Sequence, residues 1–443
     1  MDSSVTMAKG SPHRVLIIAE ACNPEWVSVP LVGWSHALAI SKVSAAHLVT
    51  QVRNRDAIER FGWREGVEFT AIDSEKVSRA LWAVSQAMRG GEGKGWTTVA
   101  AFKAPAYLYF ERLFWQRFEA ELRAGKFDLV HRITPLSPTT PSFLGKKLAR
   151  LGIPLVVGPL NGGVAWPKEF DKERRAEREW LSYVRGAYRL LPGQRSIRRH
   201  ATALVAGSSD TFGELRSVGD RLVYLPENAV DPERFVDVAR PLRTDRPLRV
   251  AFVGRLVPYK AVDMLLEASA DLVRAGRASL IIIGDGPERQ KLEGLVDTLG
   301  MRAGVEFTGW LEHTAIQERL READVLGFPS IREFGGGVVL EAMALGVVPV
   351  VVAYGGPKEL VTAESGIALP LGSRPEIVAR LAQALDGLAS DPRRVADMAR
   401  AARARVVGYF TWERKAEQSL AIYDWVLGRA PKPDFGMPLG QGQ

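Results

Sequence analysis

Two carboxylates and a run of glycines stand close together in the second half of the chain. Glu333 comes soon after an apolar stretch that is typical of a strand, and Glu341 follows it by eight residues, with Phe334, Gly335 and Gly336 in between. Glycines let a backbone approach a ligand closely, and the free N–H groups at the start of a helix favour a phosphate. Two carboxylates at one site accept hydrogen bonds from vicinal hydroxyls. The pattern therefore predicts a site for a ligand that carries both phosphate and sugar hydroxyls.

A pair of cations forms a second candidate site. Arg255 and Lys260 lie five residues apart on a loop that follows the strand expected at 248–253, and Gly254 precedes them. Such cations can reach both phosphates of a pyrophosphate, Arg as a fork and Lys as a point charge. Neutralising a departing diphosphate stabilises it as a leaving group. A loop Arg and Lys alone are more often solvated, but the Glu333 segment favours the diphosphate interpretation.

The elements that must position these residues alternate between strand and helix, which is typical of parallel sheets covered by helices. In the second half, strands are expected at residues 248–253, 279–283, 305–308, 325–328 and 348–352. Asp285 and Glu288 have the spacing of a capping box at a helix start. The predicted fold class is α/β, with two Rossmann-like domains facing a central cleft at the carboxyl ends of their sheets, where ligands bind in such folds.

A length of 443 residues is too great for one ordinary core and predicts two domains. Pro241, Asp245 and Pro247 lie in the best linker candidate. The expected divisions are an N-terminal domain at 12–236, a linker at 237–247, a C-terminal ligand-binding domain at 248–408, a helix at 409–428 that packs back on the first domain, and a tail at 429–443.

The net charge of +8 lies wholly in the first half, where residues 1–240 hold 34 Lys and Arg against 26 Asp and Glu. No acid occurs between Glu179 and Asp210. This acid-free stretch contains Arg185, Arg189, Arg195, Arg198 and Arg199. It suits an anionic membrane surface or an acidic partner, and an ordinary solvated basic face is the alternative interpretation. Nucleic acid is not expected, since no recognition module is visible.

The compartment is expected to be the cytoplasm. A single cysteine, Cys22, excludes an intramolecular disulfide and fits a reducing environment. No secretory signal is visible, and no stretch approaches the roughly 20 apolar residues of a membrane-spanning helix. Any membrane contact is therefore expected to be peripheral, on the inner face.

Taken together, these segments resemble the large family 4 of retaining glycosyltransferases, which has the GT-B fold. The resemblance covers nearly the whole chain. The motifs occur in the family's order, as Pro226-Glu227-Asn228-Ala229-Val230-Asp231, Val253-Gly254-Arg255, Lys260, Gly284-Asp285-Gly286-Pro287, Phe307-Thr308-Gly309-Trp310 and the segment from Glu333 to Glu341.

The resemblance implies roles in donor binding. Arg255 and Lys260 match the family's diphosphate ligands, Glu333 matches the carboxylate that holds the donor sugar, and Glu341 matches the one that holds the ribose. The other residues that match donor-binding positions are Gly254, Gly309, Trp310, Phe334, Gly335 and Gly336. Phe334 departs from the family, which often has glycine there. No metal or other cofactor is expected, because the two cations do that work.

Matches in the first half are weaker. Gly33 stands where the family's first loop often has two glycines, and His131 is the first residue of a sequence that departs from the family's His-x-His. His131 is a catalytic candidate or, equally, a core histidine. Asn161, Gly162 and Gly163 are candidates on the acceptor side. Several tryptophans are expected in this domain, where acceptors bind in the family, namely Trp26, Trp34, Trp96, Trp115 and Trp166.

The resemblance implies transfer of a sugar from a nucleotide-sugar donor to a glycan or lipid-linked acceptor, with retention of configuration. Bacterial cell-surface polysaccharide or glycoconjugate biosynthesis is the implied setting. No general base is obvious, and in this family the departing phosphate oxygen can accept the proton. Two alternatives stay open, a non-catalytic partner subunit that binds a nucleotide-sugar and a nucleotide-sugar epimerase.

Overall fold

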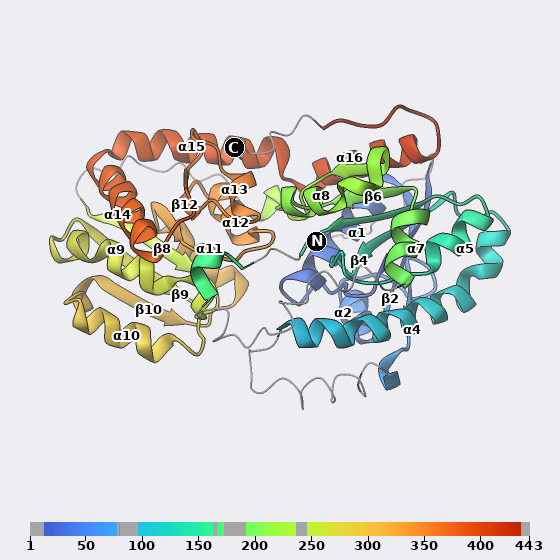
Figure 1. The fold of residues 1–443 in the computed structure, drawn as a ribbon, viewed down its shortest axis with the longest axis horizontal. Coiled ribbons are helices and arrows are strands. Elements are labelled where there is room, and N and C mark those ends of the chain that lie inside the picture. Colours follow the sequence, from blue (N-terminus) through green and yellow to red (C-terminus); the bar gives the residue numbers. More distant parts are fainter. Residues whose placement is uncertain are drawn as a thin grey trace. The chain divides into compact units, whose positions relative to one another are not determined.

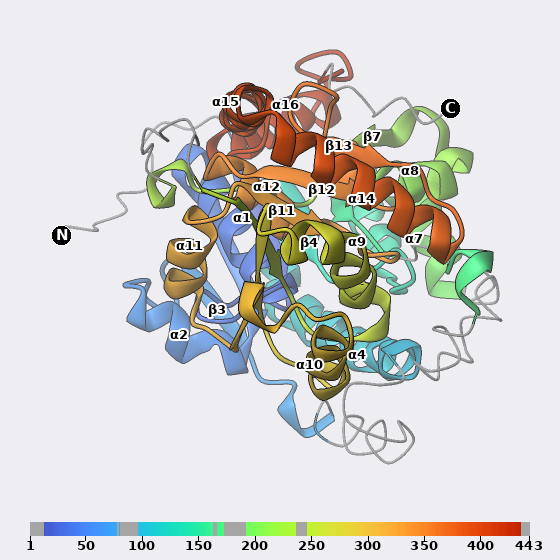
Figure 2. The same ribbon diagram turned by 90° about the vertical axis from the view of Figure 1, so that its left-hand side faces the viewer.

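The computed structural model describes residues 13–77, 79, 96–162, 166–171, 192–235 and 246–435. The chain forms two compact units (Figures 1 and 2). The first unit comprises Met1–Gly163, Arg178–Glu227 and Trp412–Gly436, and the second comprises Val164–Glu177, Asn228–Thr411 and Met437–Gln443. Each unit is built on a parallel sheet, so the prediction of two Rossmann-like α/β domains is confirmed.

The sheet of the first unit has the strand order β3-β2-β1-β4-β5-β6-β7 among the described residues. Most residues of its strands are buried, as a sheet with helices on either side requires. They are β1 (Arg14–Ala19), β2 (Ala45–Gln51), β3 (Phe69–Ile72), β4 (Leu129–Thr134), β5 (Leu155–Leu160), β6 (Ala203–Ala206) and β7 (Leu222–Tyr224).

Helices cover both faces of this sheet. They are α1 (Val29–Val43), α2 (Arg55–Arg60), α4 (Trp96–Arg123), α5 (Leu144–Arg150), α7 (Pro192–His200), α8 (Ser209–Leu215) and α16 (Trp412–Val426). Phe110 and Phe114 of the long helix α4 belong to the same buried hydrophobic cluster as Leu16 and Val130 of the sheet. The last helix that the structure describes, α16, packs beside α1, where His36 Nε2 lies 3.0 Å from the Ser419 hydroxyl. The first unit therefore contains residues that lie far apart in the chain.

The sheet of the second unit has the order β10-β9-β8-β11-β12-β13 among the described residues. The strands are β8 (Leu248–Val253), β9 (Ala278–Ile283), β10 (Val305–Gly309), β11 (Val325–Phe328), β12 (Val348–Val352) and β13 (Ile367–Leu369). The helices are α9 (Val262–Arg274), α10 (Arg289–Thr298), α11 (His313–Arg321), α12 (Gly337–Ala344), α13 (Pro357–Leu360), α14 (Arg374–Ser390) and α15 (Pro392–Tyr409). Since β8 and β11 are neighbours, the loops that follow them leave the same edge of the sheet.

One local prediction in this unit is wrong. α10 begins at Arg289, and its N-cap residue, Glu288, makes no capping hydrogen bond through its side chain. The Glu288 carboxylate instead pairs with Lys291 at 2.6 Å, and Asp285 accepts from the Gly286 N–H at 2.7 Å. Competing local partners therefore replace the expected capping box.

Two of the expected boundaries lie largely outside the described residues, namely the linker at 237–247 and the end of the tail at 429–443. Among the helices that the structure describes, none combines the length and apolarity that a membrane span requires.

Candidate functional site

The loop between β11 and α12 carries Glu333. It ends at Gly336, whose φ of 65° is a left-handed conformation that favours glycine. The Glu333 carbonyl accepts from the Gly356 N–H at 3.3 Å, and a side chain on Gly356 would collide with the Phe334 carbonyl oxygen. Glycines at 336 and 356 therefore fix the path of the backbone around Glu333, just before the N–H groups of α12.

Hydrogen bonds and an ion pair join the loop after β8 to the loop that carries Glu333. The Tyr259 carbonyl accepts from the Ile331 N–H at 3.0 Å and from the Ser330 hydroxyl at 3.3 Å. Lys260 Nζ forms an ion pair with the Glu333 carboxylate, and the two side chains are only 15% and 18% exposed. The structure thus brings together the residue matched to the diphosphate and the residue matched to the donor sugar.

The second cation of this loop, Arg255, is exposed. Its side chain makes no ion pair or hydrogen bond with the residues that the structure describes. The backbone beneath it is tightly packed, because a side chain on Gly284 would collide with the carbonyl of Gly254. Arg255 and Lys260 therefore lie in different environments, since Arg255 is open to solvent and Lys260 is held against a carboxylate.

Glu341 lies in α12. Burial raises the pKa of its carboxyl to about 7, and the Arg234 charge opposes that shift. Near neutral pH the side chain is therefore divided between its acid and its carboxylate, so that it can donate or accept a hydrogen bond.

The two residues that flank Glu333 in the sequence, Arg332 and Phe334, take part in a stack of flat side chains. The Arg332 guanidinium lies 5.0 Å from the centre of the Trp166 ring and 5.4 Å from the centre of the Phe334 ring. Trp166 also meets Tyr259 edge to face, at 6.2 Å between ring centres. Cation–π contacts of this kind stabilise a loop. Phe334, which departs from the family pattern, therefore has a packing role.

Trp166 corrects an expectation. The sequence places it with the tryptophans of the first domain, but it belongs to the second unit and packs near Ile331 and Phe170 in a small buried cluster. The assignment of this segment, between β5 and α7, to the second unit was not predicted from the sequence. The aromatic pair of Trp166 and Phe170 is the signal that could have found it.

Gly309 is the last residue of β10, and Trp310 follows it. Gly309 has a φ of 73°, and its carbonyl accepts from the Gly284 N–H at 3.0 Å. Trp310 is 65% exposed, which is unusual for a tryptophan. The glycine shapes the turn, and the ring is free to meet a ligand.

His131 has a structural environment. Its Nε2–H donates to the Gly158 carbonyl at 2.8 Å, and its Nδ1 accepts from the Tyr423 hydroxyl at 2.6 Å. Burial lowers its pKa to about 4, so the ring is neutral at pH 7. Both ring nitrogens are thus bonded within the protein, which is the environment of a core histidine.

Of the remaining candidates of the first unit, Gly33 does not lie in the expected loop, whereas Asn161 and Gly162 directly follow a strand as expected. Gly33 lies within α1 and not in a loop, and a side chain there would collide with the Ala21 carbonyl oxygen. Asn161 follows β5, is 5% exposed, and accepts from the Gly162 N–H at 2.8 Å. Gly163 lies outside the described residues. Close packing thus explains Gly33 without a ligand.

Only part of the acid-free stretch is described. Arg195 and Arg199 are exposed on α7, whereas Arg198 pairs with Glu214 at 3.2 Å. Arg185 and Arg189 lie outside the described residues.

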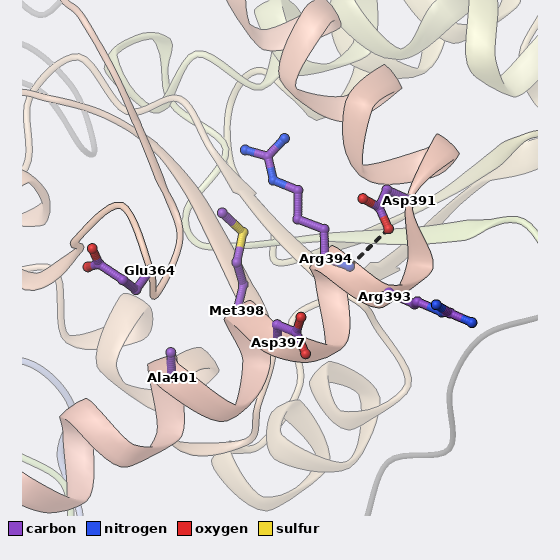
Figure 3. A pocket seen from close by; sticks show the side chains of 7 residues that line it. All are labelled: Glu364, Asp391, Arg393, Arg394, Asp397, Met398 and Ala401. Atoms are coloured by element: carbon purple, nitrogen blue, oxygen red, sulfur yellow. Dashed lines mark hydrogen bonds between the residues drawn. The ribbon is translucent and has the colours of Figure 1, made fainter.

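A surface pocket of about 550 Å³ lies elsewhere on the second unit, at the start of α15 (Figure 3). It is lined by Glu364, Asp391, Arg393, Arg394, Asp397, Met398 and Ala401. Asp391 there caps the helix by accepting from the Arg394 N–H at 3.0 Å. None of the predicted site residues lines this pocket, so it is not the candidate site.

Curated relatives are glycosyltransferases. The chain is 30% identical over 317 residues to a GDP-mannose-dependent alpha-mannosyltransferase of Mycobacterium tuberculosis, covering 70% of this chain and 75% of the relative. It is 39% identical over 295 residues to D-inositol 3-phosphate glycosyltransferase of Mycobacterium bovis, covering 56% and 59%. It is 29% identical over 248 residues to 2-deoxystreptamine glucosyltransferase of Streptomyces kanamyceticus, covering 53% of this chain and 63% of that relative's length.

Solved structures show the same fold. Sucrose-phosphate synthase from Thermosynechococcus elongatus aligns with a TM-score of 0.60 at 19% identity, over 94% of this chain and 99% of that one. Anabaena HepE, solved in complex with UDP, aligns with a TM-score of 0.58 at 14% identity, over 93% and 99%. At these identities the likeness concerns the fold, which is GT-B.

The match to a family model falls on the part of the chain that carries the Glu333 loop and both cations. Residues 236–405 match the model described as Glycosyl transferases group 1. With the mannosyltransferase relative, this shows that the chain belongs to the glycosyl transferases group 1 family.

Proposed function

We propose that the protein transfers a sugar from a nucleotide-sugar donor to an acceptor hydroxyl, with retention of the donor's configuration. One observation carries the proposal. Lys260 and Glu333 meet at the carboxyl ends of neighbouring strands, beside the N-terminus of α12 and within the segment that matches the family model. A cation, a carboxylate and free helix N–H groups suit a sugar joined to a diphosphate.

The chemistry would proceed as follows. Lys260 and Arg255 neutralise the negative charge that develops on the diphosphate as the bond to the sugar breaks. Glu333 accepts hydrogen bonds from donor sugar hydroxyls, and Glu341 accepts from the ribose. The acceptor hydroxyl attacks on the face that the diphosphate leaves, and a departing phosphate oxygen takes its proton. The two cations supply the charge that a metal ion provides elsewhere.

The relatives support a proposal for the donor and acceptor classes. The family includes an enzyme named for GDP-mannose, and HepE was solved with UDP. The named acceptors are 2-deoxystreptamine and D-inositol 3-phosphate, both polyhydroxylated rings. We infer a hydroxyl-rich acceptor, free or lipid-linked, in bacterial surface glycoconjugate synthesis.

Thermal shift with a panel of UDP-, GDP- and ADP-sugars tests donor binding. A ligand at 100 times its Kd stabilises the folded state by roughly 2.7 kcal/mol. Nucleotide-sugars that carry one of the three bases should raise the melting temperature of the wild type, and the rise should be smaller in Lys260→Ala. A panel in which no nucleotide-sugar shifts the wild type would contradict donor binding.

A pH dependence should arise at Glu341. Because a carboxylate accepts from ribose hydroxyls more strongly than a neutral acid does, nucleoside binding should favour the ionised form. With a free-protein pKa of about 7, affinity should fall about tenfold between pH 8 and pH 6. Calorimetry with the nucleoside avoids titration of phosphates. Glu341→Gln should bind equally at both pH values, and an unchanged slope in that variant would remove Glu341 from the site.

We also propose a peripheral contact with anionic membrane through α7. Its support is the exposure of Arg195 and Arg199, and each basic residue near an anionic surface contributes about 1 kcal/mol, screened by salt. Anionic vesicles should sediment the wild type at low salt, and Arg195→Gln with Arg199→Gln should weaken this. Arg198→Gln is a poor probe, since it breaks the pair with Glu214. If the wild type stays in the supernatant at low salt, the membrane contact is contradicted and α7 is an ordinary solvated face.

A further inference from the structure

A short segment of the second unit contacts both ends of helix α12. It begins at Asn228, whose amide oxygen lies 3.7 Å from the place that a Cβ on Gly337, the first residue of α12, would occupy. It ends at Phe235, whose carbonyl accepts from Arg403 Nη1 at 3.1 Å. The same nitrogen donates to the carbonyl of Ala344, the last residue of α12. The segment between these contacts therefore spans α12 from its first turn to its last.

This segment, residues 228–235, is fixed in place near its end. The Phe235 side chain is 4% exposed and belongs to the same buried cluster as Leu340 of α12. Just before it, Arg234 closes a short turn in which its N–H donates to the Asp231 carbonyl at 3.1 Å. The main chain of Arg234 is therefore held beside α12, whereas its side chain is exposed.

Arg234 brings a positive charge close to Glu341, which lies in the last turn of α12. Burial raises the pKa of the Glu341 carboxyl to about 7, and the Arg234 charge lowers that pKa. Because Arg234 is exposed, water and salt weaken the attraction. Near neutral pH, however, even a small change in this pKa alters the fraction of Glu341 that is ionised.

The elements that pack against α12 carry other charges as well. Arg403 and Arg405 of α15 donate to main-chain carbonyls, and Arg319 of α11 pairs with two glutamates. β11 and β12 carry no charged residue. The other titratable residues of α11 and α13 are His313, Glu318, Arg321, Lys358 and Glu359. Within the part of the chain that the structure describes, Arg234 is the residue whose charge acts on the pKa of Glu341.

We propose that Arg234 is a positioning residue for nucleoside binding and that it acts through Glu341. Its charge favours the carboxylate form of Glu341, which accepts hydrogen bonds from ribose hydroxyls more strongly than the neutral acid does. The 228–235 segment holds this charge beside α12. The inference rests on the proposed role of Glu341 in donor binding, and it adds the group that sets the pH range in which the site accepts the ribose.

Calorimetry with the nucleoside between pH 6 and pH 8.5 tests this role. In Arg234→Gln the midpoint of the pH dependence should move upward, so that affinity at pH 7 falls by about two- to fivefold and returns toward the wild-type value by pH 8.5. Arg234→Lys keeps the charge and should keep the wild-type midpoint. Arg393→Gln, which changes an exposed arginine at the start of α15, is the matched control and should bind like the wild type at every pH.

A structural role or a direct contact with the ligand gives different results. A structural role would lower affinity by one factor at every pH, without moving the midpoint. A direct contact would weaken binding further in the double variant Arg234→Gln with Glu341→Gln, whereas the proposal expects the double variant to bind like Glu341→Gln alone.

The proposal is overturned by a wild type without the pH dependence, by an unmoved midpoint in Arg234→Gln, or by full additivity in the double variant. Normal nucleoside diphosphate binding by the wild type in any of these cases would show that the proposed transfer function survives that failure. A wild type that binds neither nucleoside nor nucleoside diphosphate would contradict the proposed function itself.

Discussion

Replacing Glu333 with glutamine should reduce turnover by about 100-fold or more while nucleoside diphosphate binding changes little. The reason is that hydrogen bonds from the sugar hydroxyls to a carboxylate strengthen as charge develops at the sugar, and such contacts are worth roughly 3 kcal/mol. A neutral amide keeps the size of the side chain but loses the charge. Steady-state rates and calorimetry with the nucleoside diphosphate measure the two quantities.

The ion pair between Lys260 and Glu333 gives a further expectation for diphosphate binding in Glu333→Gln. Glu333→Gln frees Lys260 from its carboxylate, so diphosphate binding should stay equal or become tighter. Glu312→Gln, at the N-cap of α11, is a control in the same unit and should leave turnover unchanged. Unchanged turnover in Glu333→Gln would remove this residue from the donor site.

Replacing either cation with alanine should weaken nucleoside diphosphate binding more than nucleoside binding. Charged hydrogen bonds contribute roughly 1.5–3 kcal/mol each, or about 10- to 150-fold in affinity. Lys260→Ala should have the larger effect on turnover, because it also leaves the Glu333 carboxylate without its ion-pair partner. Arg255, which is exposed, should affect mainly the diphosphate.

Calorimetry with the diphosphate and the nucleoside of the same base separates these effects. Arg302→Ala is a suitable control, since this arginine pairs on the surface with Asp297 at 2.8 Å. Equal losses for the two ligands in Lys260→Ala and Arg255→Ala would contradict a diphosphate role.

Much of the second unit could be predicted from its sequence. The bounds of β8, β11 and β12 are predicted to the residue, because each is a short apolar run followed by a glycine-containing or polar loop. Since parallel strands present their carboxyl ends at one edge, Lys260 and Glu333 were foreseeable neighbours. Their direct ion pair was not, because it depends on the paths of both loops.

Contacts between residues far apart in the chain could not be predicted. Nothing near His131 in the sequence shows that the Tyr423 hydroxyl bonds its ring, and this contact favours a core histidine over a catalytic one. Likewise, nothing near Trp166 shows that it stacks on Arg332. The strands β2 and β3 were also missed, since their mixed apolar and polar residues give no clear period.

The most direct measurement is product analysis after incubation with the donor that the thermal-shift panel identifies. The acceptors would be D-inositol 3-phosphate, 2-deoxystreptamine and short oligosaccharides, with an acceptor-free control. The account predicts nucleoside diphosphate release that depends on an acceptor, and a glycosylated product whose anomeric configuration, read by NMR, is that of the donor. Conversion of the donor to an epimeric nucleotide-sugar without diphosphate release would contradict it, as would a product of inverted configuration.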